Sequence, residues 1–362
     1  MNYKLKYKEK KLSWVKRIKQ KILFLFRLNH HPVIVVYNGY GSSDKIFVFG
    51  HVLKLSPYMR KTYRQNWVVN IFSMLRLFMV RPYEHAKVSM QWEGRIFHAQ
   101  SQDDGFFRFE INAVVSSSPG WHNVVVRLGE PKYQAQKICG EGEVYVPFDS
   151  KYVFVSDIDD TFLISYSSRL RKRLYVLLTK NARSRKPFQG VVKHYYLLAS
   201  HGQHIDETNP FFYVSSSEWN LFYFIKEFIN KNNLPKGVYL LNVLKRFSEV
   251  LRTGQSKHAT KFFRIVRLIE AYPKRNFVLF GDDSQEDPNI YAALVEHFPG
   301  RIYAIYIRRV QKNNYSPVKK VIDKIITSGT HCCYFIHSEE AITHSVSIGL
   351  ISENKIDIQQ TL

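Results

Sequence analysis

Cysteine is scarce in this sequence. Only three occur among 362 residues, Cys139 and the adjacent pair Cys332 and Cys333. Neighbouring cysteines rarely bridge each other, and no C-x-x-C pair or Cys/His pattern with metal-ligand spacing is present. The sequence therefore indicates neither a disulfide scaffold nor a cysteine-based zinc site, and it favours a reducing compartment.

Long apolar runs without charges are also absent. The run Ile22–Phe26 is too short for the hydrophobic region of a signal peptide, and no small-residue cleavage site follows it. It falls far short of the ~20 residues that a membrane-spanning helix needs, and no later segment reaches that length. We therefore expect a cytoplasmic protein, with peripheral contact to the inner membrane face.

Acidic residues are few relative to basic ones. The chain has 30 Asp and Glu against 53 Lys and Arg, which gives a formal net charge of +23. This imbalance favours an anionic partner, such as nucleic acid, anionic lipid or a phosphorylated substrate.

The first 28 residues concentrate this charge, with ten basic side chains and Glu9 as the only acid. Val15, Ile18, Ile22 and Leu25 recur there at helical spacing. A basic amphipathic helix suits an anionic membrane surface, which attracts each Lys or Arg by roughly 1 kcal/mol. A flexible basic tail, or a helix packed on the protein body, is the alternative.

The rest of the composition is that of a globular protein, with 45% apolar and 15% aromatic residues. The chain is long enough for two domains. We expect a basic N-terminal segment over residues 1–30, a β-rich accessory domain over residues 31–148 and an α/β domain over residues 149–362.

The pattern of residues 32–147 predicts short strands separated by turns rich in Gly, Asp and Pro. The expected strands are Val33–Tyr37, Ile46–Leu53, Ala86–Trp92, Arg95–Gln100, Phe106–Ile111 and His122–Leu128, with a turn at Gly39–Asp44 after the first. Short strands at this spacing are typical of a β-sandwich. This region holds no catalytic constellation, because its histidines are scattered.

After residue 150, apolar strands alternate with helical segments, which predicts a parallel α/β sheet. The first strand, Tyr152–Ser156, is followed directly by Asp157 and Asp159, and Thr161 closes the run. Carboxylates crowded at the end of a buried strand repel each other and lose hydration, and a divalent metal is the usual compensation. For an isolated pair of acids, a solvated turn before an acidic helix start is the alternative.

A second buried strand, Phe211–Val214, ends in three serines. A hydroxyl at a strand end can donate a hydrogen bond to a phosphoryl oxygen, with backbone N–H groups assisting. The segment Glu218–Phe228 follows as a predicted helix. We therefore expect Ser217 to cap this helix and Ser215 to bind phosphate, with Ser216 beside it in the binding set.

A third buried strand, Asn276–Phe280, leads into a glycine and a second group of acids. Asp282 is the natural direct metal ligand, whereas Asp287 binds the metal through water or anchors a lysine. Mg²⁺ prefers such oxygen ligands and commonly retains waters. The predicted metal ligands are Asp157, Asp159, Asp282 and Asp287.

Two lysines lie near the start of a predicted helix at Ser256–Ala271. A site for phosphoryl transfer needs a fixed cation beside the attacked phosphorus, and lysine supplies it as a point charge. From the residues alone, Lys257 and Lys261 compete for this role.

These motifs occur in the order found in the haloacid dehalogenase superfamily, whose phosphatases form a phosphoaspartate: Asp157-x-Asp159-x-Thr161, Ser215, a helix lysine and Gly281-Asp282 with Asp287. More narrowly, the strings VSDIDDT, PFFYVSSSEWNLF and FVLFGDDSQEDPNIY resemble the phosphatidate phosphatases of the App1 type. The resemblance covers most of residues 32–350. The sequence departs from the family where Glu218 replaces proline, and where Asp283 and Ser284 replace serine and glycine.

The resemblance implies a Rossmann-like parallel sheet of the haloacid dehalogenase type, with a cap insert near residues 168–209. It selects Lys261 as the catalytic lysine by its spacing to Ile265 and Pro273. It also implies Mg²⁺-dependent release of phosphate from phosphatidate. Asp157 would be the nucleophile, Asp159 the general acid and base, and Thr161 a brace for the loop.

Other functions stay open on the sequence alone. A phosphatase of this superfamily could act on a soluble phosphomonoester, because fold does not fix the substrate. A non-catalytic basic module that binds anions or nucleic acid is a third reading, although the complete acid set argues against it. We expect an anionic phospholipid or other phosphomonoester and no nucleic acid as partner, and the sequence does not indicate an oligomeric state.

Overall fold

The structure of the chain is a computed structural model, in which the described residues are 28–29, 31–42, 44–57, 77–112, 118–131, 133, 137–159, 161, 187–202, 207–244, 257–311 and 315–353. The predicted basic helix before residue 28 and most of the predicted cap near residues 168–209 lie outside these ranges.

The C-terminal half contains a six-stranded, wholly parallel sheet in the order β13-β12-β11-β14-β15-β16. Its strands are β11 (Tyr152–Ser156), β12 (Phe211–Glu218), β13 (Val238–Asn242), β14 (Asn276–Asp282), β15 (Ile302–Arg308) and β16 (His331–Phe335). The central strands are almost continuous apolar runs because helices cover both of their faces. Phe154, Phe212 and Leu279 accordingly have no exposed surface.

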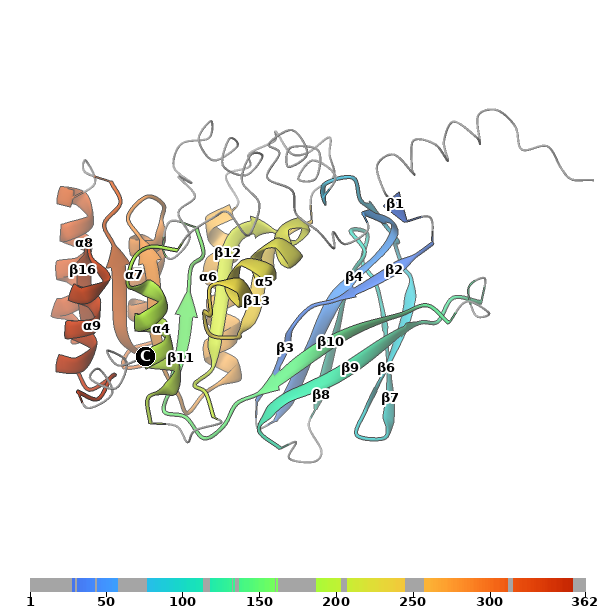
Figure 1. Cartoon of the computed structure of the whole chain (residues 1–362), viewed down its shortest axis with the longest axis horizontal. Helices are drawn as coiled ribbons and strands as arrows, with labels where there is room; N and C mark the ends of the chain where they lie inside the picture. The colour runs from blue at the N-terminus through green and yellow to red at the C-terminus, as the bar shows by residue number, and fades with distance from the viewer. Residues whose placement is uncertain are drawn as a thin grey trace, which may run out of the picture.

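The helices of this half connect the strands and cover the sheet. They are α4 (Val191–Ser200), the short 3₁₀ helix η2 (Trp219–Leu221), α5 (Phe222–Lys231), α6 (Lys257–Ala271), α7 (Asp287–His297), α8 (Tyr315–Thr327) and α9 (Ser338–Ser347). Helix α4 packs against α9, while α6, α7 and α8 pack side by side, and the two groups lie on opposite faces of the sheet (Figure 1). Among the described residues, no helix has the length and apolar character needed to cross a membrane.

The N-terminal half is a ten-stranded sheet, which lies beside the α/β half in Figure 1. Its strands are β1 (Leu28–Asn29), β2 (Val33–Val36), β3 (Gly39–Gly41), β4 (Lys45–Pro57), β5 (Arg81–Pro82), β6 (Lys87–Trp92), β7 (Arg95–Gln100), β8 (Phe106–Asn112), β9 (Gly120–Leu128) and β10 (Cys139–Val146). The expected combination of a parallel α/β sheet and a preceding β-rich region is therefore confirmed.

The long strand β4 faces two cores, because successive side chains of a strand point to opposite sides. Ile46, Val48 and Val52 pack into a cluster made only by the β-rich half. Phe47 and Phe49 point the other way and join the cluster that fills the α/β half. The two halves are thus continuous through a shared apolar layer.

Several details differ from the sequence predictions. The predicted turn at Gly39–Asp44 contains strand β3, which pairs in parallel with β10, and neither β10 nor β13 was predicted. Strand β12 runs through the serines to Glu218, so the following α-helix begins at Phe222 rather than at residue 218. The prediction that Ser217 caps that helix is wrong, because Ser217 still belongs to the strand.

Candidate functional site

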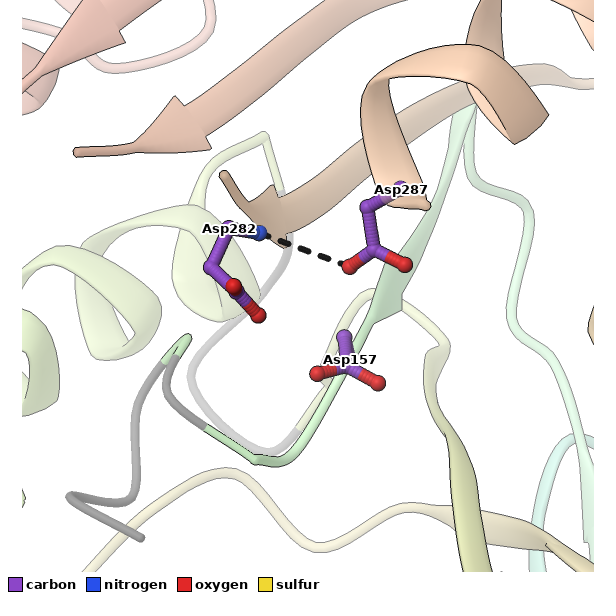
Figure 2. A group of neighbouring side chains, drawn as sticks. All are labelled: Asp157, Asp282 and Asp287. Atoms are coloured by element: carbon purple, nitrogen blue, oxygen red, sulfur yellow. Dashed lines mark hydrogen bonds between the residues drawn. The ribbon is translucent and has the colours of Figure 1, made fainter. Parts of the chain in front are cut away.

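Three buried carboxylates meet at the carboxyl edge of the parallel sheet (Figure 2). Asp157 follows β11, Asp282 ends β14, and Asp287 begins α7. One oxygen from each lies within 4.8 Å of the others, and no more than 2% of any of the three is exposed. Because parallel strands end at the same edge, two sequence motifs 125 residues apart form one cluster.

Lys261 of α6 reaches into this cluster. Its Nζ donates to Asp157 Oδ1 at 2.8 Å and also to Asp287 Oδ1. Only 2% of Lys261 is exposed, so both ion pairs are buried. Of the two lysines predicted to compete, the structure therefore places Lys261 beside the acids. The side chain of Lys257 lies outside the described residues.

The cluster holds more negative charge than one lysine balances. Burial raises the pKa of Asp157 to about 8, because the opposing effect of Lys261 is smaller and the charge of Asp287 adds to the rise. Burial, together with Asp287 and Asp157, also raises the pKa of Asp282 well above its usual range. For Lys261, burial lowers the pKa, but the two carboxylates outweigh burial and the net shift is upward.

The donor set fits a small hard cation. The three acids present only oxygen atoms, close enough to share one ion, and the raised pKa values of Asp157 and Asp282 indicate that added positive charge would favour the ionised form of both. Mg²⁺ takes oxygen ligands of this kind and keeps waters in its remaining positions. Asp157, Asp282 and Asp287 are therefore the residues that could hold it.

One backbone hydrogen bond and the Thr161 hydroxyl hold the acids close to one another. The N–H of Asp157 donates to the carbonyl of Phe280 on the neighbouring strand at 2.8 Å. The Thr161 hydroxyl lies 3.4 Å from Asp157 Oδ2 and 3.5 Å from Asp282 Oδ2, where it bridges the two strand ends. Thr161 thus lies where a brace for the loop was expected.

Glycine is needed at position 281 because of close packing, and not because the backbone makes a turn there. It lies within β14, and its φ is not among the positive values of the described residues. A Cβ at this position would lie 2.5 Å from Asp287 Oδ2 and 2.8 Å from the ring of Tyr291. Glycine therefore allows the Asp287 carboxylate to approach the strand end.

Asp159 lies apart from the three clustered acids, although it was predicted among the metal ligands. The Ser217 hydroxyl donates to its Oδ2 at 2.7 Å, and the Ser215 hydroxyl approaches the same oxygen at 3.4 Å. The Ser217 N–H in turn donates to Ser215 Oγ at 2.9 Å. Ser217 is therefore a partner of Asp159, and the half-buried Ser216 lies between the two.

Arg308 is a buried side chain that the sequence analysis missed. It ends β15, where its Nε donates to the carbonyl of Thr161 at 2.8 Å and its Nη2 to Ser338 Oγ at 3.0 Å. The guanidinium lies against the rings of Phe188 and Phe335. Burial lowers its pKa to about 10, so it stays charged at neutral pH. The sequence feature that could have identified this residue is an arginine at the end of the apolar run IYAIYI.

Arg264 was missed as well. It lies one helical turn after Lys261 on α6, and its Nη1 donates to the carbonyl of Ser215 at 3.0 Å. Its Nη2 donates to Asn242 Oδ1 at 3.1 Å, at the end of β13. Arg264 thus joins the ends of β12 and β13 beside the serines, and helical spacing from Lys261 was the available signal.

Asp283, one of the residues that departs from the resembled family, anchors a loop. Its Oδ1 accepts from the backbone N–H groups of Val310 and Gln311 at 2.8 and 3.0 Å. Its Oδ2 accepts from the Tyr334 hydroxyl at 2.8 Å. The carboxylate is turned toward the end of β15, so this departure leaves the three clustered acids unchanged.

A family model described as "Phosphatidate phosphatase APP1, catalytic domain" matches residues 152–309. This range contains the three clustered acids, Asp159, the serines and Lys261. The resemblance to the App1-type family is therefore confirmed for this part of the chain.

Two curated relatives match smaller parts. Phosphatidate phosphatase APP1 of Saccharomyces cerevisiae is 33% identical over 98 residues, which is 27% of this chain and 16% of the yeast protein. A protein of Schizosaccharomyces pombe described as uncharacterized is 32% identical over 114 residues, which is 31% of this chain and 18% of that protein. The chain thus spans less than a fifth of the length of these relatives.

Among solved structures, a carbohydrate acetylesterase from Xanthomonas citri aligns over 84% of this chain and 68% of its own, at 10% identity. Its TM-score of 0.30 is too low to support an argument about fold or function.

Proposed function

We propose that this chain is a phosphatidate phosphatase, a Mg²⁺-dependent phosphomonoester hydrolase that forms an aspartyl-phosphate on Asp157. The observation that carries the proposal is the buried cluster in which Asp157, Asp282 and Asp287 meet beside Lys261. The family match over residues 152–309 supports the same reaction class.

Mg²⁺ is the cation that the clustered oxygen atoms suit best, through Asp157, Asp282 and Asp287. When bound, it supplies positive charge that neutralises phosphoryl oxygens and offsets the repulsion among the acids. The Asp159 carboxylate contacts the serines. If Asp159 contacts the metal, its backbone carbonyl would be the ligand atom.

In the first step, a carboxylate oxygen of Asp157 attacks phosphorus in line with the ester oxygen. The new O–P bond forms as the ester P–O bond breaks, which leaves an aspartyl-phosphate and releases the alcohol. Lys261, 2.8 Å from Asp157 Oδ1, favours the ionised nucleophile and holds it in one orientation. Thr161 braces the same carboxylate from the loop.

Asp159 moves the protons. It donates one to the departing ester oxygen, and in the second step it accepts one from the water that attacks the aspartyl-phosphate. That attack releases inorganic phosphate and restores Asp157. The Ser217 hydroxyl, at 2.7 Å, holds the Asp159 carboxyl in place for both transfers. Because the Asp159 carboxyl is not one of the clustered acids, it is available to exchange protons.

Ser215, Ser216 and Lys261 are proposed to hold the phosphoryl group. Ser215 ends the second apolar run at the same edge of the sheet, where its hydroxyl and nearby N–H groups are donors for phosphoryl oxygens. Arg264 fixes the Ser215 backbone at 3.0 Å, so these donors are held before substrate arrives.

Phosphatidate is proposed as the substrate because the matched family and the yeast relative carry that name. The formal charge of +23 favours an anionic lipid surface, to which the basic residues 1–28 would add contact. We propose a cytoplasmic location with peripheral membrane contact, and no nucleic-acid partner.

We assign the parallel sheet to the haloacid dehalogenase type, with Asp157 after a central strand, flanked by β12 and β14. We also propose a division into a basic segment at residues 1–30, a β-rich domain at residues 31–148 and a catalytic domain at residues 149–362 with a cap near residues 168–209. The β-rich half has an apolar cluster of its own, which supports the boundary after residue 148.

Phosphate release from phosphatidate in mixed micelles tests this function, with and without Mg²⁺ and beside a soluble aryl phosphate. Mg²⁺-dependent release from the lipid is the expected result. Activity on the aryl phosphate alone would keep the reaction class and contradict the lipid substrate. No turnover of either compound would contradict the proposed function as a whole.

A further inference from the structure

We propose that the β-rich half positions the proton-transferring Asp159 through a stacked aromatic pair, Tyr37 and Trp219. This inference rests on the proposed phosphatase function and assigns a role to the half of the molecule that the family match does not cover. Tyr37 and Trp219 act here as positioning residues, since neither touches the reacting atoms.

The two rings come from opposite halves of the molecule and lie face to face. Tyr37 follows β2, whereas Trp219 opens η2 directly after β12. Their centroids are 3.9 Å apart with an angle of 12° between the planes. Phe222 contacts the Tyr37 ring edge-on from α5, and Phe49 of β4 lies beside Trp219. Trp219 is therefore held in a buried aromatic cage.

Tyr37 is itself fixed. Its hydroxyl is 2.8 Å from His51 Nδ1 on β4, and only 2% of the residue is exposed. Burial lowers the pKa of His51 to about 3, so its ring is neutral over the working pH range. Tyr37 thus presents a rigid face, because an aromatic side chain with a satisfied hydroxyl has few conformations left.

Trp219 lies two residues after Ser217, the serine that contacts Asp159. Ser217, two positions earlier, donates to Asp159 Oδ2 at 2.7 Å. The intervening Glu218 is buried and pairs with Asn242 of β13, where the register of the β12–β13 ladder shifts. A ring anchored at Trp219 therefore fixes where this irregular strand end places the Ser217 hydroxyl.

Further hydrogen bonds between the halves converge on the same region. Asn220 Nδ2 donates to the carbonyl of Leu77 at 2.9 Å. Asn38 Nδ2, next to Tyr37, donates to the carbonyl of Gly237 at 3.1 Å, at the start of β13. On its other side the serine segment is held within the α/β half, by Arg264 on the carbonyl of Ser215.

The test compares Tyr37→Leu with Tyr40→Leu. Tyr40 is a matched control because it is also buried in the shared core and neighbours Phe49, but the rings of the α/β half that it contacts are those of Phe212 and Tyr272, not that of Trp219. Two experiments are made: one measures kcat and KM for an aryl phosphate with Mg²⁺, and the other measures amide hydrogen exchange of residues 215–221.

We expect Tyr37→Leu to lower kcat by about tenfold or more, with KM changed less than about threefold, since small misplacements of catalytic groups can cost 10²-fold. Exchange should accelerate in residues 215–221 and stay unchanged in α4. Tyr37→Phe keeps the stacked ring and should retain nearly full kcat, whereas Tyr40→Leu should lower thermal stability and leave kcat close to the wild-type value.

A second route uses Trp219→Leu and the double variant with Tyr37→Leu. If the two rings act through their contact, the double variant should lose no more kcat than the worse single variant. Equal losses of kcat in the Tyr37 and Tyr40 variants, or unchanged exchange in residues 215–221, would overturn the inference. If the wild type hydrolyses nothing, the proposed function fails, and the exchange experiment still decides whether the aromatic pair positions this segment.

Discussion

The two halves of the molecule differ most in what they bury. Among the described residues, every buried side chain that carries a formal charge belongs to the α/β half: Asp157, Asp159, Glu218, Lys261, Asp282, Asp283, Asp287 and Arg308. In the described part of the β-rich half, the buried polar residues are Asn38, His51 and Ser101, and none of them is an acid, a lysine or an arginine. Both halves are built from apolar strands with paired backbones, so the fold does not require buried charge.

The buried charges indicate which half of the molecule contains the candidate site. Burying a charge is costly unless it is paired, so unneeded charges are absent from cores. In the α/β half the charged groups gather at the carboxyl edge of the sheet, where Lys261 only partly compensates the three acids. The β-rich half, by contrast, contributes packing contacts: its Tyr37 ring stacks on Trp219, in the segment whose Ser217 holds Asp159.

Replacing the nucleophile should have the largest effect. Asp157→Asn removes the attacking carboxylate but keeps the shape of the side chain, so we expect phosphate release to fall by at least about a thousandfold. Release of phosphate from phosphatidate and from an aryl phosphate measures the loss.

Asp283→Asn is the matched control for this variant. Asp283 is an equally buried acid that holds the Val310 and Gln311 backbone instead of the clustered acids. It should cost stability and retain most of the turnover in folded protein. Metal-dependent turnover that survived in Asp157→Asn would remove Asp157 from the mechanism.

Mg²⁺ should stabilise the α/β half through the clustered acids. A ligand that binds only the folded state at 100 times its Kd adds about 2.7 kcal/mol to the free energy of unfolding. We therefore expect the thermal midpoint of the wild type to rise with Mg²⁺, and that of Asp282→Asn to rise much less. Equal shifts in both proteins would place the cation elsewhere.

The sequence predicts the parts of the site that follow apolar strands. Asp157 and Asp282 could be placed together because each ends a buried run, and parallel strands share an edge. Contacts between distant segments could not be predicted in this way. The stack of Tyr37 on Trp219 joins residues 182 positions apart, and neither side chain differs in type from an ordinary core aromatic.

Strand β10 shows why part of the fold was missed. Its first residues, CGEGE, carry no apolar alternation. Gly140 and Gly142 are required by space, since a Cβ at either would lie 2.4 Å from an atom of β2. Ser217 was misplaced for a related reason. A serine before an apolar run is typical of a helix cap, but here the strand continues through it to Glu218.

The pH dependence of stability should separate the charged site from the rest of the molecule. Burial raises the pKa of Asp157 from 3.8 to about 8, so between these values the folded carboxyl keeps a proton that the unfolded chain releases. Without metal, this group therefore makes folding less favourable as the pH rises from about 4 to about 8. The thermal midpoint in a chelator should fall more steeply with pH for the wild type than for Asp157→Asn. Parallel curves would contradict the raised pKa.

The smallest effect is expected from a change confined to the β-rich core. Ile46 is 1% exposed and faces the cluster made only by that half, on the side of β4 away from the Tyr37–Trp219 pair. Ile46→Val removes one methylene and should lower the free energy of unfolding by about 0.5–1.5 kcal/mol. Urea unfolding measures this loss, and kcat for the aryl phosphate should stay within twofold of wild type. A larger drop in kcat would show that turnover depends on packing throughout the β-rich half, beyond the face that contacts the α/β sheet.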